Sequence, residues 1–91
     1  MRRQYIRNDE CEATQLNDEW LILNTNNFTV TKVNEVGGFC WNLLSEIQTI
    51  SDLAYAVEKH FDGAGSNEKV RQELSEFMNE LLKCELIHLV S

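Results

Sequence analysis

The side chains in this sequence that could carry out chemistry are three cysteines and two histidines. Nucleophilic catalysis needs a thiol beside a base, and Cys40 with His60 is the candidate pair. Cys40 falls on the apolar side of a predicted helix, however, where burial would raise the pKa of its thiol and keep it protonated, the wrong state for attack. The sequence therefore predicts a protein that is not an enzyme.

The same residues offer neither a metal site nor a disulfide framework. Cys11, Cys40 and Cys84 are odd in number and form no Cys-x-x-Cys pair, and His60 and His88 lie at no ligand-like spacing from them. Buried or unreactive thiols in a reducing compartment are the simplest interpretation. We expect neither a metal nor a cofactor.

Length and charge limit the choice of function further. The chain has 91 residues, no proline and a formal charge of −7, which suits one domain with one modest core and leaves little room for a deep active-site cleft. Three of its eight basic residues precede Asn8, so the remaining five face 15 acidic residues. A surface of this charge would repel nucleic acid, which makes DNA or RNA an unfavourable partner.

The N-terminal segment is basic but carries no targeting signal. No apolar run approaches the roughly 20 residues of a membrane-spanning helix, and residues 1–7 lack the apolar stretch of a secretory signal. We therefore expect a cytoplasmic protein with no membrane partner. Residues 1–10 are expected to form a flexible basic N-terminus, followed by one domain over residues 11–91.

The elements that position these residues change type near Asn34. Before it, three runs containing aromatic and β-branched residues are separated by the turn residues Asn17-Asp18 and Thr25-Asn26-Asn27. These runs predict a three-stranded antiparallel sheet with strands over residues 11–16, 19–24 and 28–33.

After Asn34 the apolar spacing becomes helical. Asn34 is the natural N-cap of a first helix, whose apolar stripe extends to Ile47. Thr49 and Asp52 have the spacing of a capping box that opens a second helix. Three strands followed by three helices predict an α+β fold.

The third helix begins after a glycine-containing segment. Gly63-Ala64-Gly65-Ser66 is expected to end the second helix, and Ser66 or Asn67 to cap the third, which must stop by Cys84. The apolar run over residues 86–90 is too short for a helix and predicts a terminal strand.

The apolar stripe of the third helix is off-centre. At ~100° per residue, Val70, Leu74 and Phe77 share a narrow arc, and Met78 widens it toward Arg71. This margin is either a wall for a partner or a contact with the other two helices, and the sequence leaves both interpretations open.

One segment carries a resemblance to a known family. Residues 33–41, Val-Asn-Glu-Val-Gly-Gly-Phe-Cys-Trp, resemble the PqqD-like proteins, the recognition elements for precursors of ribosomally made, modified peptides (RiPPs). The family pattern there is leucine-asparagine, two residues, a glycine or alanine pair and an apolar-tryptophan step. Residues 49–53 and 81–87 resemble the family's second-helix opening and closing segment. The resemblance covers about residues 11–90 and implies a winged-helix-like architecture.

Three positions depart from the family pattern. Val33 stands where leucine is more common and Cys40 where a branched aliphatic is common, and both keep an apolar role. Glu85 stands where glycine is usual before Leu86-Ile87, which leaves the end of the third helix open.

The resemblance implies a non-catalytic adaptor. Family members bind the leader segment of a precursor peptide and present its core segment to modifying enzymes. Free-standing members of this length occur with lasso-peptide enzymes, where a separate leader peptidase and a cyclase act, and this is the favoured function. A PqqD-type chaperone that delivers a precursor to a radical SAM enzyme is the alternative.

The resemblance also implies where the leader binds. The family's mode is strand addition, with the leader antiparallel to the third strand and against the third helix, and no proline interrupts that strand. Val30, Leu74, Phe77 and Met78 would form an apolar pocket. Arg71 and Lys32 suit an acidic leader residue or act as gatekeepers against aggregation. The implied leader-binding residues are Phe28, Thr29, Val30, Thr31, Lys32, Val70, Arg71, Leu74, Phe77 and Met78.

Two other functions share some of these features. A winged-helix DNA-binding regulator has the same order of helices, but the third helix here carries four glutamates against three basic residues. A homodimer paired through the open sheet edge is the second possibility.

Overall fold

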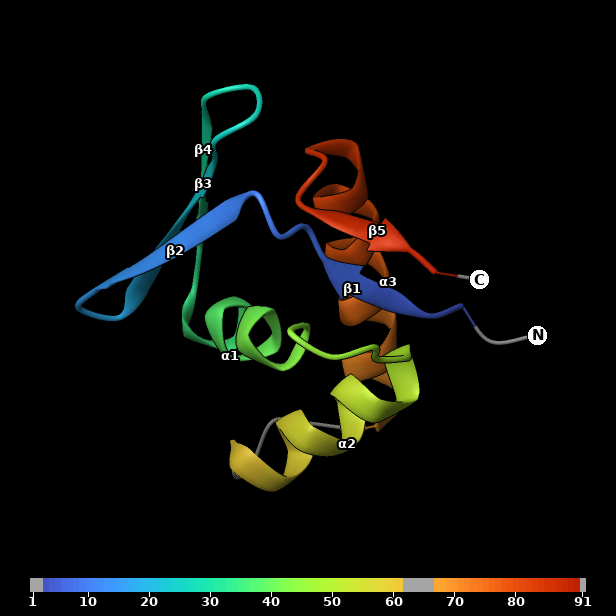
Figure 1. Cartoon of the computed structure of the whole chain (residues 1–91). Helices are drawn as coiled ribbons and strands as arrows, with labels where there is room; N and C mark the ends of the chain where they lie inside the picture. Colours follow the sequence, from blue (N-terminus) through green and yellow to red (C-terminus); the bar gives the residue numbers. More distant parts are fainter. Residues whose placement is uncertain (1–2, 62–66, 91) are drawn as a thin grey trace.

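The computed structural model describes residues 3–61 and 67–90 of the chain (Figure 1). The described chain forms four strands, then three helices and a final strand. Their bounds are β1 Tyr5–Arg7, β2 Cys11–Leu16, β3 Glu19–Asn24, β4 Thr29–Val33, α1 Glu35–Leu43, α2 Ile50–His60, α3 Asn67–Lys83 and β5 Ile87–Leu89. The α+β class and the winged-helix-like succession of a three-stranded sheet and three helices are confirmed.

The three-stranded sheet has the order β2-β3-β4, with antiparallel pairing throughout. Trp20 of β3 pairs with Val33 of β4, and Asn24 pairs with Thr29. The bounds predicted for β2 and β3 are confirmed. Phe28 is not in β4 as predicted but in the turn before it, with a φ of 57° that is incompatible with an extended strand.

A second sheet corrects the expectation of a flexible N-terminus. Tyr5–Arg7 forms β1, which pairs antiparallel with the predicted terminal strand, β5. The Tyr5 side chain is 3% exposed. The backbone N–H of Tyr5 donates to the carbonyl of Gln48 (2.8 Å), and the N–H of Gln48 donates back to Tyr5 (2.9 Å). The boundary drawn at residue 11 therefore cuts through the folded unit.

The helix starts follow the predicted caps. The Asn34 side chain accepts a hydrogen bond from the Gly37 N–H (2.8 Å), and Thr49 and Asp52 form the reciprocal bonds of a capping box. Helix α1 ends at Leu43, so Ile47 lies beyond it in the loop and is 49% exposed. The predicted end of α2 at residues 63–66 lies outside the described residues.

Helix α3 ends where predicted although glycine is absent. Glu85 adopts the left-handed φ of 59°, its N–H donates to the Leu82 carbonyl (3.1 Å), and the Leu86 N–H donates to the Leu81 carbonyl (2.9 Å). These two bonds define a Schellman motif, which usually places glycine at the position of Glu85. The helix boundary is thus kept with a strained glutamate.

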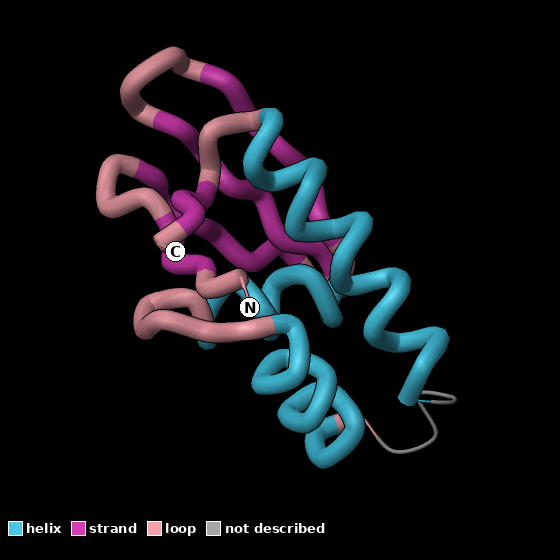
Figure 2. The backbone as a smooth tube through the Cα atoms, turned by 90° about the vertical axis from the view of Figure 1, so that its right-hand side faces the viewer, coloured by secondary structure: helices cyan, strands magenta, loops and turns pink. Residues whose placement is uncertain are grey.

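The core lies where the helices meet the two sheets. In Figures 1 and 2, α3 stands across from the three-stranded sheet, with β1 and β5 over one of its sides and α1 and α2 at its lower end. None of the helices in residues 3–61 and 67–90 has the length and apolar character to cross a bilayer. The largest fully buried side chains are Trp41, Ile22, Leu44, Leu53, Met78, Leu81 and Leu86.

Candidate functional site

The outer edge of β4 is open. In the sheet order β2-β3-β4, β4 has a neighbour on one side, and the terminal strand β5 pairs with β1 instead. No described strand pairs with the other side of β4. Such an edge presents backbone N–H and C=O groups that can pair with another chain.

The hydrogen-bond alternation indicates which residues of β4 offer those groups. The Thr25 N–H donates to the Glu10 carbonyl (3.1 Å) just beyond the paired ends of β3 and β2. Hydrogen-bonded and non-bonded residue pairs alternate along an antiparallel ladder. Successive residues of β3 therefore bond alternately to β2 and to β4. This alternation turns the peptide groups of Val30 and Lys32 toward the open edge.

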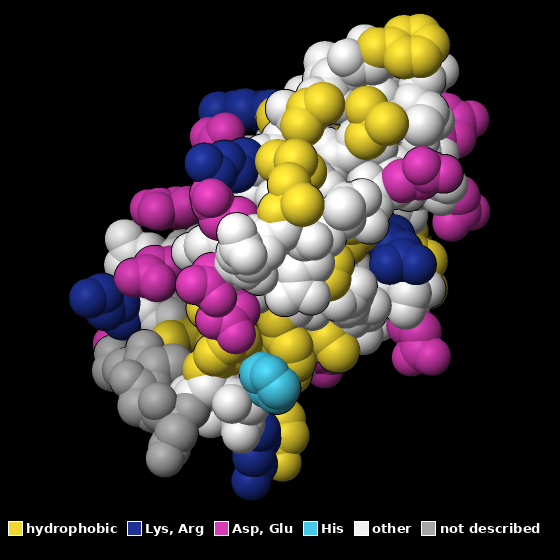
Figure 3. All heavy atoms as spheres, turned by 90° about the vertical axis from the view of Figure 1, so that its left-hand side faces the viewer, with side chains coloured by type: hydrophobic (Ala, Val, Ile, Leu, Met, Phe, Trp, Pro, Cys, Tyr) yellow, Lys and Arg dark blue, Asp and Glu magenta, His cyan; other side chains and the backbone are white. Residues whose placement is uncertain are grey.

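The side chains of β4 divide between two faces. Thr31 lies opposite the buried Ile22, and Val33 is itself in the core. Val30, which is 62% exposed, lies opposite Leu23 on the outer face. Figure 3 shows apolar side chains gathered over this sheet and again lower down among the helices.

An apolar groove begins where β4 ends. It has a volume of about 340 Å³ and lies between the start of α1, the end of α2 and residues 70–77 of α3. Glu73 is the charged residue on its wall. The lining residues are Asn34, Val36, Gly37, Val57, Phe61, Val70, Glu73, Leu74 and Phe77.

The glycine pair of α1 allows the helix to approach its neighbours closely. A Cβ at Gly38 would overlap Cδ1 of Trp20, and one at Gly37 would lie 2.9 Å from the Cβ of Val33 and 3.1 Å from the Phe77 ring. Contacts this short would force the elements apart. Because Gly37 and Gly38 have no side chains, α1 packs closely against the sheet and the groove is not filled at this point.

The structure groups the predicted leader-binding residues differently from the pocket drawn from the sequence. Val70, Leu74 and Phe77 do line the groove. Val30 lies on the outer face of the sheet, and Met78 is 0% exposed in the core. The sequence-derived pocket of Val30 with Leu74, Phe77 and Met78 is thus replaced by one whose other walls come from α1 and α2.

The polar residues of the predicted site also lie apart. Lys32 forms an ion pair with Glu19 on the outer face of the sheet (2.7 Å). Arg71 donates from Nη1 to the Oγ of Ser51 (3.0 Å) and lines a different hollow. Thr29 is exposed and Phe28, at the hairpin tip, is 83% exposed.

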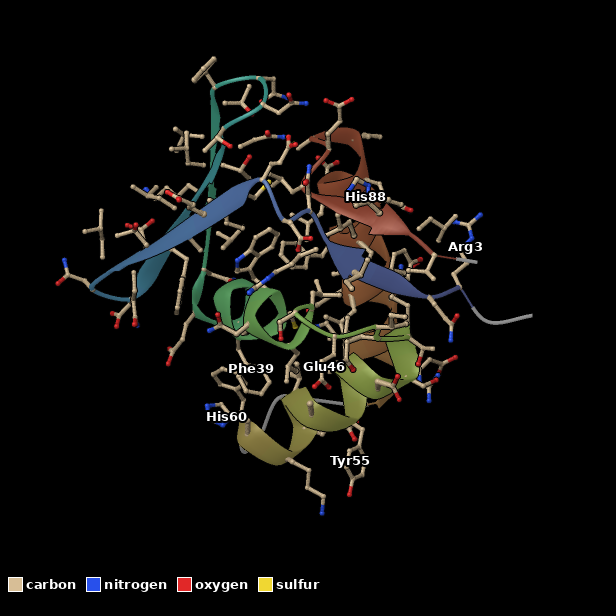
Figure 4. All side chains as sticks on the ribbon, viewed as in Figure 1. Arg3, Phe39, Glu46, Tyr55, His60 and His88 are labelled. Atoms are coloured by element: carbon tan, nitrogen blue, oxygen red, sulfur yellow. The ribbon has the colours of Figure 1, made fainter. Side chains whose placement is uncertain are left out.

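The α1 and α2 residues of the groove were missed as site residues. The apolar spacing of Val36, Val57 and Phe61 in the sequence predicts burial, but not which of these residues reach a surface. Phe61 belongs to an aromatic cluster in which Phe39 stacks on His60, with 4.4 Å between ring centroids. Figure 4 shows Phe39 and His60 together at the far end of α2, with Tyr55 pointing away.

The thiol considered for catalysis is buried as expected. Desolvation raises the pKa of Cys40 to about 12, and the thiol is therefore neutral near pH 7. His60, the base considered with it, stacks on Phe39. Within residues 3–61 and 67–90, no three His, Cys, Asp or Glu side chains are placed to hold a metal ion.

Comparisons with known proteins agree with this architecture. Two solved structures share the fold. TbiB1 in complex with the TbiA(beta) leader peptide matches with a TM-score of 0.78 at 22% identity, over 91% of this chain and 94% of that one. Lasso peptide synthetase B1 complexed with the leader peptide matches with a TM-score of 0.75 at 10% identity, over 92% and 96% of the two chains. No curated protein matches the sequence.

A family model covers most of the domain. Residues 19–87 match the family described as coenzyme PQQ synthesis protein D (PqqD). The match includes β3, β4, all three helices and the start of β5. It also includes the glycine pair whose close contact with Trp20 and Val33 shapes the groove. The chain belongs to the PqqD family.

Proposed function

We propose that this protein is a non-catalytic adaptor that binds the leader segment of a ribosomally made precursor peptide, of the lasso type. The leader would add a strand to the open edge of β4 and place apolar side chains in the groove beside α3. The observation that carries this proposal is the continuity of the two features: β4 ends at Val33, and the groove begins at Asn34. Two solved structures with this fold hold leader peptides, which supports it.

The open edge of β4 and the apolar groove are both needed, for energetic reasons. A ladder hydrogen bond contributes a net ~0.5–1.5 kcal/mol, because each one replaces bonds to water. A few such bonds roughly offset the entropy lost when a flexible peptide is ordered, and they carry little sequence preference. Burial of one leucine-sized side chain in the groove adds about 1.5–3 kcal/mol. The edge therefore captures an extended chain, and the groove selects which chain binds.

The direction of β4 fixes the direction of the leader. β4 runs from the hairpin tip at Thr29 toward the groove at Asn34. A strand added antiparallel to β4 runs the opposite way, from the groove to the tip. The N-terminal part of the paired leader segment would thus occupy the groove, and the chain would leave beside Phe28, where the core peptide becomes accessible to other proteins.

The partners of the adaptor would be the enzymes that act on the presented peptide. In the lasso pathway these are a separate leader peptidase and a cyclase, which act in the cytoplasm. The description of the family favours one alternative, a PqqD-type chaperone that delivers a precursor to a radical SAM enzyme. The genes beside this one distinguish the two, because the enzymes they encode differ in class.

The other two functions receive less support. The exposed side of α3 includes Glu68, Glu73, Glu76 and Glu80, an unfavourable surface for the phosphates of DNA. A homodimer through β4 would occupy the same edge as the leader. Light scattering with and without leader distinguishes it, because leader would then dissociate the dimer.

The proposal is tested by measuring the affinity of the leader, made as a labelled synthetic peptide from the precursor gene beside this one. Phe77→Ala removes a groove wall, and we expect it to weaken binding about tenfold or more, since an aromatic contact is lost. Tyr55→Ala is the matched control, because Tyr55 is 64% exposed and does not line the groove. Leu74 is unsuitable for this purpose because it is 4% exposed, and a charge there would disrupt the core.

The outcome is interpreted with the fold verified by circular dichroism. A folded Phe77→Ala protein that binds leader as tightly as wild type would exclude the groove. Equal losses in Phe77→Ala and Tyr55→Ala would point to a general effect on stability rather than to a site. Robust retardation of DNA at low salt, without leader binding, would favour the regulator.

A further inference from the structure

Glu73 gives the apolar groove an acidic margin. It is the charged residue on the groove wall, and its side chain is exposed. Val70, Leu74 and Phe77 of the same helix line the groove beside it. None of the ion pairs between described residues includes Glu73. Its carboxylate can therefore pair with a ligand that occupies the groove.

The acidic margin continues along α3. Glu73, Glu76 and Glu80 are spaced at i, i+3 and i+7, which places them along one side of the helix, and all three are exposed. Figure 3 shows acidic side chains beside the lower group of apolar side chains. The whole chain has a formal charge of −7. This side of α3 therefore attracts a cationic segment and repels an anionic one.

A carboxylate at the margin of an apolar groove matches the side chain of lysine or arginine. Each has a long apolar stem that packs along apolar surface while its charged head reaches a polar partner. In the groove, the stem would lie on Val70 and Phe77, and the head would reach Glu73. An apolar side chain leaves the carboxylate without a partner, and an acidic one is repelled. The groove therefore discriminates by charge as well as by apolar fit.

The direction of α3 sets the order of these contacts along the leader. Asn27, in the hairpin turn, bonds to Glu85 just beyond α3 (3.3 Å), whereas Val33 and Phe77 lie against the same glycine of α1. Helix α3 thus runs from the groove toward the hairpin tip, the direction proposed above for the leader (Figure 1). Glu73 precedes Phe77 by four residues, a rise of about 6 Å. Two residues of an extended chain span about 6.6 Å and return to the same face.

We infer that the groove selects a leader with a lysine or arginine two residues before the apolar residue that contacts Phe77, and that Glu73 is responsible for this selection. The inference rests on the leader-binding function proposed above and names the class of leader. The apolar residue supplies most of the affinity, because exposed ion pairs are weak. The charge determines which leaders are accepted.

The selection is tested by fluorescence anisotropy with labelled variants of the leader encoded beside this gene. An alanine scan first locates the anchor, the apolar leader residue whose substitution weakens binding to the wild-type protein but not to Phe77→Ala. Leaders with lysine or glutamate two residues before the anchor are then compared. We expect the lysine leader to bind the wild-type protein about fivefold more tightly at low salt. The difference should shrink as salt is added.

Reversal of the charge at Glu73 identifies the residue responsible. Glu73→Lys should reverse the preference, so that the glutamate leader binds more tightly than the lysine leader. The matched control is Glu12→Lys, the same change of charge at an exposed position of β2, which lies on the far side of β3 from the open edge and outside the groove lining. It should keep the wild-type preference, since salt screens exposed charges that are far apart. Circular dichroism verifies both folds.

The outcomes separate this inference from the function on which it rests. A folded Glu73→Lys protein that still prefers the lysine leader would overturn the role of Glu73, as would an equal change of preference in Glu12→Lys. Equal affinity of the wild-type protein for the two leaders would overturn selection by charge and leave leader binding intact. Absence of binding to every leader variant would refute the proposed function itself.

Discussion

At Glu85 the backbone adopts a conformation that glycine reaches at lower cost. A left-handed conformation costs a residue with a Cβ about 1–2 kcal/mol, and the Schellman motif imposes it here. Glu85→Gly should remove this strain and lose one exposed hydrogen bond between Asn27 Nδ2 and Glu85 Oε2 (3.3 Å). We expect a net gain of about 1 kcal/mol, which raises the Tm by roughly 4–8 °C in thermal unfolding of a domain this size.

The control for Glu85→Gly is the same substitution inside the helix. Glu80→Gly lies in α3, where glycine costs about 1 kcal/mol relative to good helix formers, and should lower the Tm. A fall in Tm for both variants would mean that Glu85 contributes more through its side chain than it loses through its backbone.

The burial of Cys40 predicts its reactivity. Its pKa is raised to about 12 by desolvation, so the reactive thiolate is almost absent in the native state at pH 8. Cys11 and Cys84 are half-buried. Iodoacetamide should therefore alkylate Cys11 and Cys84 before Cys40 in the native protein and all three in denaturant, as measured by peptide mass spectrometry.

The same burial makes stability depend on pH in the alkaline range. The unfolded thiol ionises near its ordinary pKa of 9.0, whereas the native thiol stays neutral until about 12. The native state therefore holds more protons between these values, and the stabilisation from the neutral thiol, complete below pH 9, is lost as pH rises toward 12. The free energy of unfolding should decline less over this pH range in Cys40→Ala than in the wild type. An equal decline in both proteins would contradict this prediction.

Most elements could be predicted because their signals are local. The turn residues after Leu16 and Asn24, the cap at Asn34 and the capping box at Thr49 each act within four residues, and each lies where the sequence placed it. Phe28 was assigned to a strand because aromatic residues favour strands, but the geometry of the turn requires it at a positive φ. Local propensity was overridden there by the closure of the hairpin.

The features that were not predicted from the sequence depend on pairing between segments that are distant in the chain. β1 has three residues, and the residues with which they pair lie 80 to 84 positions away, so its own sequence gives a weak signal. The strand predicted at residues 86–90 was assigned no partner from the sequence. Likewise, the stripe of α3 was read correctly, but whether Val30 faces it depends on which face of the sheet packs on the helices.

The open edge of β4 predicts the effect of a proline. Val30→Pro should remove an N–H that faces the edge while keeping the ladder to β3, since proline is tolerated where its missing donor faces solvent. We expect leader binding to fall about tenfold or more, because the ring also blocks the approach of an added strand. Fluorescence anisotropy of a labelled leader measures it, with circular dichroism as the check on the fold.

The opposite edge of the same sheet provides the control. The alternation that turns Val30 outward also turns the N–H of Gln15, on β2, toward the other edge. Gln15→Pro should therefore match Val30→Pro in its effect on the sheet but leave leader binding unchanged. Equal affinities in the two variants would show that the leader does not pair with β4.

The sheet formed by β1 and β5 joins the N-terminal and C-terminal segments of the described chain. β1 bonds to β5, and the Val90 N–H donates to the Gln4 carbonyl (2.7 Å). The Asn8 N–H donates to the Leu86 carbonyl (2.8 Å), and Tyr5 is bonded to Gln48 in the loop before α2. This sheet covers α3 and engages the terminal strand, so that the edge of β4 stays open.

If this sheet stabilises the fold, substitutions of the two tyrosines should lower the free energy of unfolding by very different amounts. Tyr5→Ala would empty a site that is 3% exposed, and we expect a loss of about 3–5 kcal/mol, as for other large buried aromatic residues. Tyr55→Ala, at a site 64% exposed, should change stability by no more than about 0.5 kcal/mol. Urea unfolding of both variants measures the difference. Similar midpoints would mean that β1 adds little, and that residues 11–91 form the stable unit expected from the sequence.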